Sequence, residues 1–166
     1  MDQLGILATL GSIAASMVGF AGLLTAFRAS NERLDANDVT NIRILLIFSV
    51  SALVFALLPL PFAAGDLAHE PAWRGFAITL GLYLLFWTIQ SPRWMKRKRL
   101  RPRRPLLYAA MLIAQGVMGS VMVAASLLSW HAHSLYVAGV LWCLIAAIVV
   151  FVVQVFRMLP LNGREE

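Results

Sequence analysis

LYVAGVLWCLIAAIVVFVVQVF, residues 135–156, is a run of 22 residues that contains no Asp, Glu, Lys or Arg. The hydrocarbon core of a bilayer is roughly 30 Å thick, and an α-helix of about 20 apolar residues spans it. Lipid offers no hydrogen-bond partner to the backbone, so a spanning segment must satisfy its own N–H and C=O groups. The run is therefore predicted to cross a membrane as an α-helix.

Four similar runs precede it, at about residues 4–27, 44–64, 73–90 and 106–129. Arg74, at the edge of the third run, is the one charged residue within the five. The same reasoning makes each run a membrane helix. The predicted fold class is an all-α integral membrane protein, in which residues 1–166 form a single domain with five transmembrane helices.

The composition of the chain agrees with this class. Of 166 residues, 60% are hydrophobic and 13% are charged, whereas about a quarter of the residues of a soluble domain are charged. The first run follows no basic residue, and its apolar stretch of about 24 residues is longer than that of a cleaved signal peptide, so it should remain as a helix. Cys143 is the only cysteine, which excludes a disulfide within the chain.

Prolines and a serine mark the expected helix ends. Pro59 and Pro61 predict a kink or an early end of the second helix, because proline cannot continue the backbone hydrogen bonding. Ser91-Pro92 predicts either the end of the third helix or the cap of a short new helix. Ser134 is predicted to cap the fifth helix after a tight turn.

The distribution of basic residues predicts the orientation. With five crossings, segments 28–43 and 92–105 and the C-terminal tail share one side, which holds thirteen of the fourteen Lys and Arg residues. Cytoplasmic loops of membrane proteins carry such an excess. We therefore expect a multi-pass protein of a bacterial cytoplasmic (inner) membrane, with the N-terminus outside and the C-terminus inside.

The densest basic segment, SPRWMKRKRLRPRRP at 91–105, allows three interpretations. It could determine topology alone, contact anionic lipid headgroups at the cytoplasmic face, or bind nucleic acid. No base-stacking platform and no second domain accompany it, so nucleic acid is not expected as a partner. Trp94 and Met95 suggest a short interfacial segment whose apolar side chains enter the headgroup layer. The residues of this predicted lipid-contacting loop are Arg93, Trp94, Lys96, Arg97, Lys98, Arg99, Arg101, Arg103 and Arg104.

The first run carries seven small residues at alternating spacings of three and four, which places them along one side of a helix. Small residues let membrane helices approach closely. This small-residue row could pack against another helix of the chain, or it could be a seam for self-association or for a membrane partner. Its members are Gly5, Ala8, Ser12, Ala15, Gly19, Gly22 and Ala26.

The fourth run carries a second pattern. Met111, Gln115, Met118 and Met122 fall on one side of the predicted helix. Methionine can line an adaptable pocket, and an intramembrane Gln needs a hydrogen-bond partner. The face could line the path of a small channel or carrier, or it could simply pack against another helix. Binding of Cu(I) by the thioethers is a third possibility.

The three histidines of the chain fall on the outer side. His131 and His133 lie between the fourth and fifth runs, and His69 lies between the second and third, near Asp66 and Glu70. Two imidazoles and a carboxylate could bind zinc or copper, although rings at this depth need no function. Haem is less favoured, because no predicted helix contains a histidine to supply an axial ligand.

No catalytic constellation is recognisable in the sequence. It contains no buried carboxylate pair, no nucleophile motif and no phosphate-binding glycine loop. We therefore expect no enzyme activity and no cofactor. The predicted function is that of a non-enzymatic membrane protein acting through helix packing as an oligomer or accessory subunit. The alternatives are a small channel or carrier and, less favoured, an outer-face metal or haem binder.

Two stretches, VGFAGLLTAFR at 18–28 and NIRILLIFSVSALVFALLPL at 41–60, resemble a group of small uncharacterised bacterial inner-membrane proteins. The resemblance covers about the first 60 residues and implies a multi-helix membrane protein, without an established activity. The five-helix plan with an outside N-terminus is also that of the translocator proteins that bind porphyrins and cholesterol. Their Trp- and Pro-rich signature is not found in this sequence, so the resemblance carries no ligand.

Overall fold

The computed structural model describes residues 3–31, 36–64, 70–97, 105–128 and 131–158, some of them at helix ends by their backbone alone. Within these ranges the chain forms helices and no strands. Five of the helices are long and apolar enough to cross a membrane, which confirms the predicted all-α class. The elements are α1 Gln3–Asn31, α2 Ala36–Leu57, the short α3 Leu60–Ala64, α4 Glu70–Arg97, α5 Pro105–Leu127 and α6 Ala132–Met158.

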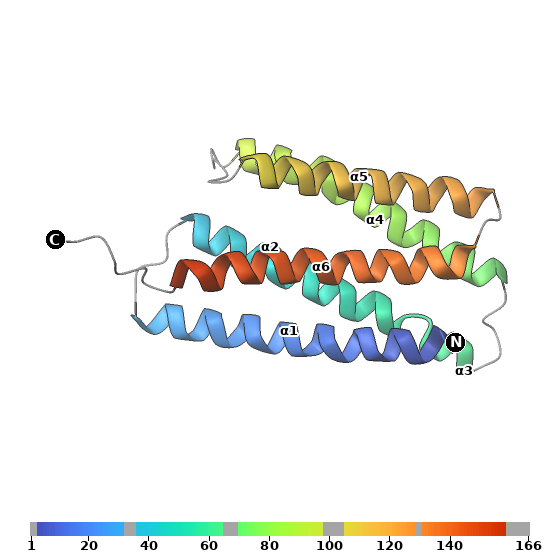
Figure 1. Cartoon of the computed structure of the whole chain (residues 1–166), viewed down its shortest axis with the longest axis horizontal. Helices are drawn as coiled ribbons and strands as arrows, with labels where there is room; N and C mark the ends of the chain where they lie inside the picture. The colour runs from blue at the N-terminus through green and yellow to red at the C-terminus, as the bar shows by residue number, and fades with distance from the viewer. Residues whose placement is uncertain (1–2, 32–35, 65–69, 98–104, 129–130, 159–166) are drawn as a thin grey trace.

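The five long helices run alternately up and down, and α6 lies at the centre of the bundle (Figure 1). α6 packs against α1, α2, α4 and α5. The bundle therefore has two halves that share α6: α1 and α2 form one close pair, and α4 and α5 form the other. α2 and α4 flank α6 without close backbone packing against each other.

The alternating path brings the basic segments to one end of the bundle. The end of α1, the start of α2, the end of α4 and the end of α6 lie together on the left of Figure 1. Arg43 of α2 and Arg93, Lys96 and Arg97 of α4 lie at this end. Arg74, in the first turns of α4, lies at the opposite end. We call the end of the bundle that holds Arg43, Arg93, Lys96 and Arg97 the basic end.

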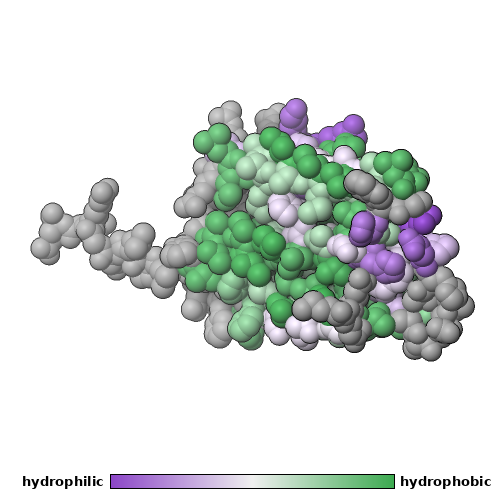
Figure 2. All heavy atoms as spheres, turned by 45° about the vertical axis from the view of Figure 1, so that its right-hand side comes forward, coloured by the Kyte–Doolittle hydropathy of each residue, from purple (hydrophilic) through white to green (hydrophobic). Residues whose placement is uncertain are grey.

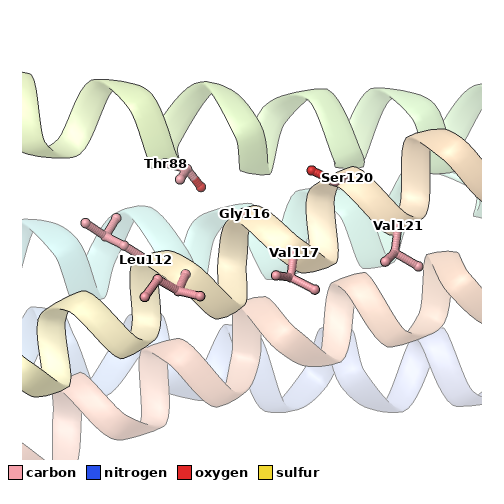
Figure 3. Close-up of a pocket in the computed structure, with 7 residues that line it drawn as sticks. Thr88, Leu112, Gly116, Val117, Ser120 and Val121 are labelled. Carbon is pink, nitrogen blue, oxygen red and sulfur yellow. The ribbon is translucent and has the colours of Figure 1, made fainter.

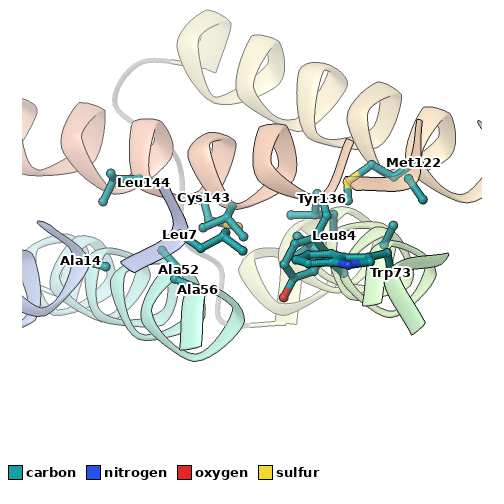
Figure 4. Close-up of a cluster of buried hydrophobic side chains, with 14 residues drawn as sticks. Leu7, Ala14, Ala52, Ala56, Trp73, Leu84, Met122, Tyr136, Cys143 and Leu144 are labelled. Carbon is teal, nitrogen blue, oxygen red and sulfur yellow. The ribbon is translucent and has the colours of Figure 1, made fainter. Parts of the chain in front are cut away.

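A compact interior joins the two halves (Figure 4). Leu7 of α1, Ala52 of α2, Leu84 of α4, and Tyr136 and Cys143 of α6 are buried in one apolar cluster. These side chains come from both halves of the bundle, so the cluster is the core that holds the halves on α6.

The outer surface is also apolar. Large hydrophobic side chains are exposed on all five long helices, including Phe20, Val54, Phe86, Val117 and Ile145. In the face shown in Figure 2 they cover most of the surface, and hydrophilic side chains gather mainly at the right and along the upper edge. A water-soluble monomer rarely exposes so much continuous apolar surface, whereas a bilayer solvates it.

The second span differs from its predicted range of 44–64. α2 begins at Ala36 and ends at Leu57, and α3 follows separately. The prediction of an early end at Pro59 and Pro61 is confirmed. Pro59 has no N–H to offer the carbonyl of Phe55 four residues earlier. The Tyr136 hydroxyl donates to that carbonyl at 2.5 Å, so α6 supplies the hydrogen bond that the proline cannot.

The third span is longer than its predicted range of 73–90. α4 continues through Pro92 to Arg97, so the prediction that the helix ends at Ser91, or that a new one starts there, is wrong. Trp94 and Met95 extend a membrane helix and do not form a separate interfacial segment. Met95 is 8% exposed and packs inside the protein, which contradicts the expectation that it enters the headgroup layer.

The fifth span begins earlier than the predicted residue 135. α6 starts at Ala132, so Ser134 lies inside its first turn and is not its cap. His131, just before the helix, has a φ of 42°. The consecutive helices α5 and α6 run antiparallel on either side of this residue (Figure 1).

Candidate functional site

The small-residue row of α1 faces outward. All seven of its members are exposed, while Leu7, Gly11, Ala14 and Ala21, on another side of the helix, are buried. The interpretation that the row packs against another helix of the same chain does not describe the structure. The row instead lies on the outside of the bundle.

Close helix packing explains other glycines of the chain but not those of the row. A Cβ added at Gly81 of α4 would lie 3.0 Å from the carbonyl oxygen of Gly119 of α5, and one at Gly119 would lie 2.9 Å from that of Gly81. A Cβ added at Gly19 or Gly22 would meet no described atom within 4 Å. The fold therefore requires small residues between α4 and α5, but it does not require glycine at positions 19 and 22 of the row.

Leu57 of α2 borders the row, and two other large side chains lie on the same side of α2. Val50, Val54 and Leu57 are between 43% and 51% exposed and occupy one side of α2. A Cβ added at Gly11 of α1 would lie 3.6 Å from Cδ2 of Leu57, which places Leu57 against α1. Ala8 and Ala15, three residues before and four after Gly11, are its neighbours on the helix surface. Large and small side chains thus lie side by side on one outer face, which we call the α1–α2 face.

The Met and Gln side of α5 is filled by packing. Gln115 is 5% exposed and donates from Nε2 to the carbonyl oxygen of Leu84 at 3.1 Å, which ties α5 to α4. Met122 is fully buried, and its Sδ would lie 2.7 Å from a Cβ added at Gly139 of α6. Met111 and Met118 are half-buried. This arrangement matches the packing interpretation, and it leaves the channel or carrier function as an untested prediction.

A shallow apolar pocket of about 490 Å³ lies on the outer side of α5, beside α4 (Figure 3). Thr88 of α4 and Gly116 and Ser120 of α5 supply part of its wall. Its full lining is Thr88, Leu112, Ile113, Gly116, Val117, Ser120 and Val121. None of the four residues predicted to line a path contributes to it.

The histidines are only partly described. His133 lies in the first turn of α6, with its ring centroid 4.9 Å from that of Trp73, and His131 is exposed. His69 lies outside the described residues. Within the part of the chain that the structure describes, no three His, Cys, Asp or Glu residues come together as metal ligands would. His133 is placed by an aromatic contact, and the metal site stays a prediction.

At the basic end, the structure pairs two residues that the sequence analysis treats separately. The Arg43 guanidinium lies over the Trp94 ring, 5.2 Å from its centroid. Arg93, Lys96 and Arg97 are exposed nearby along the chain, and residues 98–104 of the predicted basic loop lie outside the described residues. The position of Trp94 within a basic run suggested a role for its ring at the membrane interface. Nothing in the sequence identified Arg43 of α2 as the cation that contacts this ring.

Two further contacts across the bundle were not predicted. The hydroxyls of Ser51 and Tyr83 share a hydrogen bond between α2 and α4, and the Ser51 hydroxyl also lies 2.6 Å from the Ile47 carbonyl oxygen, within hydrogen-bond distance. Tyr136 bonds to the carbonyl that Pro59 leaves free. The second contact could have been anticipated in part from the sequence. A proline in a membrane segment leaves the carbonyl four residues earlier without its backbone donor, and that carbonyl needs another one.

Comparison of the chain with protein-family models, with curated proteins and with solved structures finds no match.

Proposed function

We propose that the protein is a non-enzymatic, multi-pass protein of a bacterial cytoplasmic membrane that acts through helix packing, with the α1–α2 face as its association surface. The observation that carries the proposal is that Gly19 and Gly22 are exposed and that an added Cβ at either would meet no described atom within 4 Å. A spanning helix with seven small residues on an outward side is adapted to the close approach of another helix.

Physical chemistry supports a helix as the occupant of this face. Lipid chains are as apolar as leucine, so membrane helices associate through close packing and not through a hydrophobic drive. Small residues allow a second backbone to come near and increase the number of dispersion contacts. Lipid alone needs no such row, and large side chains such as Phe86 or Val117 serve as well on the rest of the surface.

A second copy of the chain fits the shape of this face. In a two-fold dimer the same surface is used by both subunits, so each must offer its own complement. The α1–α2 face does so, because the small-residue rows of two copies can lie against each other while Val50, Val54 and Leu57 pack along the border of the contact. A homo-oligomer is therefore the first form of the proposal, and an accessory subunit bound to another membrane protein is the second.

The proposed orientation places the basic end in the cytoplasm. Arg43, Arg93, Lys96 and Arg97 lie at one end of the bundle, and in the sequence thirteen of the fourteen Lys and Arg residues belong to residues 28–43, 92–105 and 157–166. Cytoplasmic enrichment of Lys and Arg supports an outside N-terminus and a cytoplasmic C-terminus.

The mass of the full-length protein in lipid nanodiscs tests the association. We expect particles that hold more than one 18.3 kDa chain, and we expect Gly19→Leu to reduce them to single chains, because leucine fills the approach site. Gly75→Leu is the matched control, since Gly75 is also exposed on a helix, and a Cβ there would meet no described atom within 4 Å. A wild-type protein with one chain per particle would overturn the homo-oligomer.

A wild-type protein that is a single chain when purified but is captured with a membrane partner through Gly19 would support the accessory subunit. The readout is cross-linking in native membranes, followed by comparison of Gly19→Leu with Gly75→Leu. Equal partner recovery from both variants would overturn this form as well.

A further inference from the structure

The basic end brings an aromatic ring and several cations to the depth of lipid headgroups. The apolar spans of α2 and α4 are bounded at this end by Ile42 and Arg97. Arg43 is the first residue inside the former boundary, and its guanidinium lies over the Trp94 ring at 5.2 Å from the centroid. The contact therefore links α2 and α4 near the ends of their apolar spans, which is where lipid headgroups are expected.

The cations at this end exceed the acidic residues that could neutralise them. In the sequence, residues 28–43, 92–105 and 157–166 contain thirteen Lys and Arg residues but only five Asp and Glu residues, namely Glu32, Asp35, Asp38, Glu165 and Glu166. Glu70, the one acidic side chain that the structure describes, pairs with Arg74 at the opposite end. An anion from outside the chain is therefore favoured at the basic end.

One side of α4 changes from apolar to cationic along its length, which complements the apolar chains and the anionic phosphate of a phospholipid. Leu82, Phe86 and Ile89 are more than half exposed and lie on one side of the helix. Arg93 and Arg97, which continue that side toward the basic end, are also exposed. Acyl chains can thus lie on the apolar part while the headgroup meets the arginines.

The neighbouring surface between α2 and α4 is lined by aromatic residues. The ring centroids of Phe55 and Tyr83 are 5.3 Å apart, and those of Tyr83 and Trp87 are 6.4 Å apart. These side chains and Trp94 are half-buried. Because α2 and α4 do not pack closely through their backbones, side chains join them, and part of each ring stays open to the membrane.

We propose that the protein binds one anionic phospholipid at this place. Its phosphate lies against Arg43, Arg93 and Arg97, and its acyl chains lie along Leu82, Phe86 and Ile89 of α4. One guanidinium group can donate two parallel hydrogen bonds to two phosphate oxygens. The Trp94 ring holds the Arg43 guanidinium in place by its electrostatic attraction to the cation. A free phosphate would use the arginines alone, whereas a phospholipid uses the whole side of α4.

Lipid titration with native mass spectrometry tests the proposal on the full-length protein in detergent. The probes are dioleoyl phosphatidylglycerol and dioleoyl phosphatidylcholine, which share their acyl chains. We expect the first to bind at least tenfold more tightly. Arg43→Gln and Arg97→Gln should each weaken its binding about fivefold, the effect of one cation at an anionic membrane surface. Arg74→Gln, at the other end, should leave it unchanged.

Three results would overturn the proposal. Equal binding of the two lipids would remove the role of headgroup charge. Equal loss in Arg43→Gln and Arg74→Gln would show a nonspecific effect of net charge. In a competition experiment, inorganic phosphate could displace bound phosphatidylglycerol as effectively as added phosphatidylglycerol does. That result would show an anion site without acyl contacts. Far-UV circular dichroism of each variant confirms that the exposed substitutions leave the helices intact, and the association in nanodiscs is measured separately, so the two proposals fail independently.

Discussion

At the scale of single residues, two groups of glycines can be compared. Gly81, Gly119 and Gly139 lie where side chains or backbones of neighbouring helices leave no room for a Cβ. Gly19 and Gly22 have that room but are glycine nonetheless. Glycine disfavours a helix by about 1 kcal/mol relative to alanine in water. Gly75 also has open space, but Gly19 and Gly22 belong to a row of seven small residues along one side of α1, and a contact outside the chain explains that row best.

The first group gives a prediction for stability. Gly81→Ala should destabilise the protein by about 1–3 kcal/mol, because the new Cβ would lie 2.9 Å from Cγ2 of Val123 and 3.0 Å from the backbone oxygen of Gly119. Unfolding by sodium dodecyl sulfate in mixed micelles, followed by circular dichroism, measures the change. Gly75→Ala, with open space around it, should have no destabilising effect. Equal losses in both variants would contradict the packing described for α4 and α5.

The sequence predicted residue types better than residue neighbours. It identified the small-residue row from spacing alone, but spacing does not tell which side of a helix faces the bundle when nearly all sides are apolar. α1 has exposed leucine and phenylalanine as well as exposed glycine. Gln115 is a similar case. The sequence showed that this intramembrane amide needs a hydrogen-bond partner, but only the structure identifies the partner as the Leu84 carbonyl.

At the scale of elements, two prolines had different outcomes. Pro59 ends α2, and Pro92 lies within α4. The sequence predicted a break at both, because proline removes one hydrogen bond in either place. The difference lies in the surroundings: α4 continues into a turn that is anchored by the burial of Met95 and by the contact of Trp94 with Arg43. Helix boundaries set by such tertiary contacts are beyond a local sequence pattern.

The end of α2 gives a second prediction. Tyr136→Phe should lower the free energy of unfolding by about 1 kcal/mol, because it leaves the partly buried Phe55 carbonyl without the donor that replaces the missing N–H of Pro59. Tyr83→Phe should cost less, since Ser51 can still donate to the Ile47 carbonyl. Both variants are measured by the same detergent unfolding assay. A larger loss for Tyr83→Phe would contradict the role assigned to Tyr136.

At the scale of the whole molecule, the number of spans and their antiparallel order were predictable, because length, hydropathy and loop charge determine them. The central position of α6 was not, since it depends on which apolar faces fit together. α6 is the partner of all four other long helices. It therefore holds the two halves of the bundle and leaves outer sides of α1 and α2 available to another chain.

The proposed orientation has a direct test with single cysteines in a Cys143→Ala background. Ala68→Cys, between α3 and α4, should react with a membrane-impermeant maleimide in intact spheroplasts, because the proposed orientation puts this connection outside. Lys98→Cys, after the end of α4, should react only after the membrane is opened. The reverse pattern would contradict the orientation inferred from the basic residues.

The measurement that tests the central claim most directly is cross-linking through the small-residue row in native membranes. In a Cys143→Ala background, Gly19→Cys should form a disulfide-linked dimer on oxidation, because the rows of two copies face each other. Val117→Cys, which is exposed on α5 away from that face, should stay monomeric under the same conditions. Absence of a dimer from Gly19→Cys, or equal dimer from both variants, would contradict association through the row.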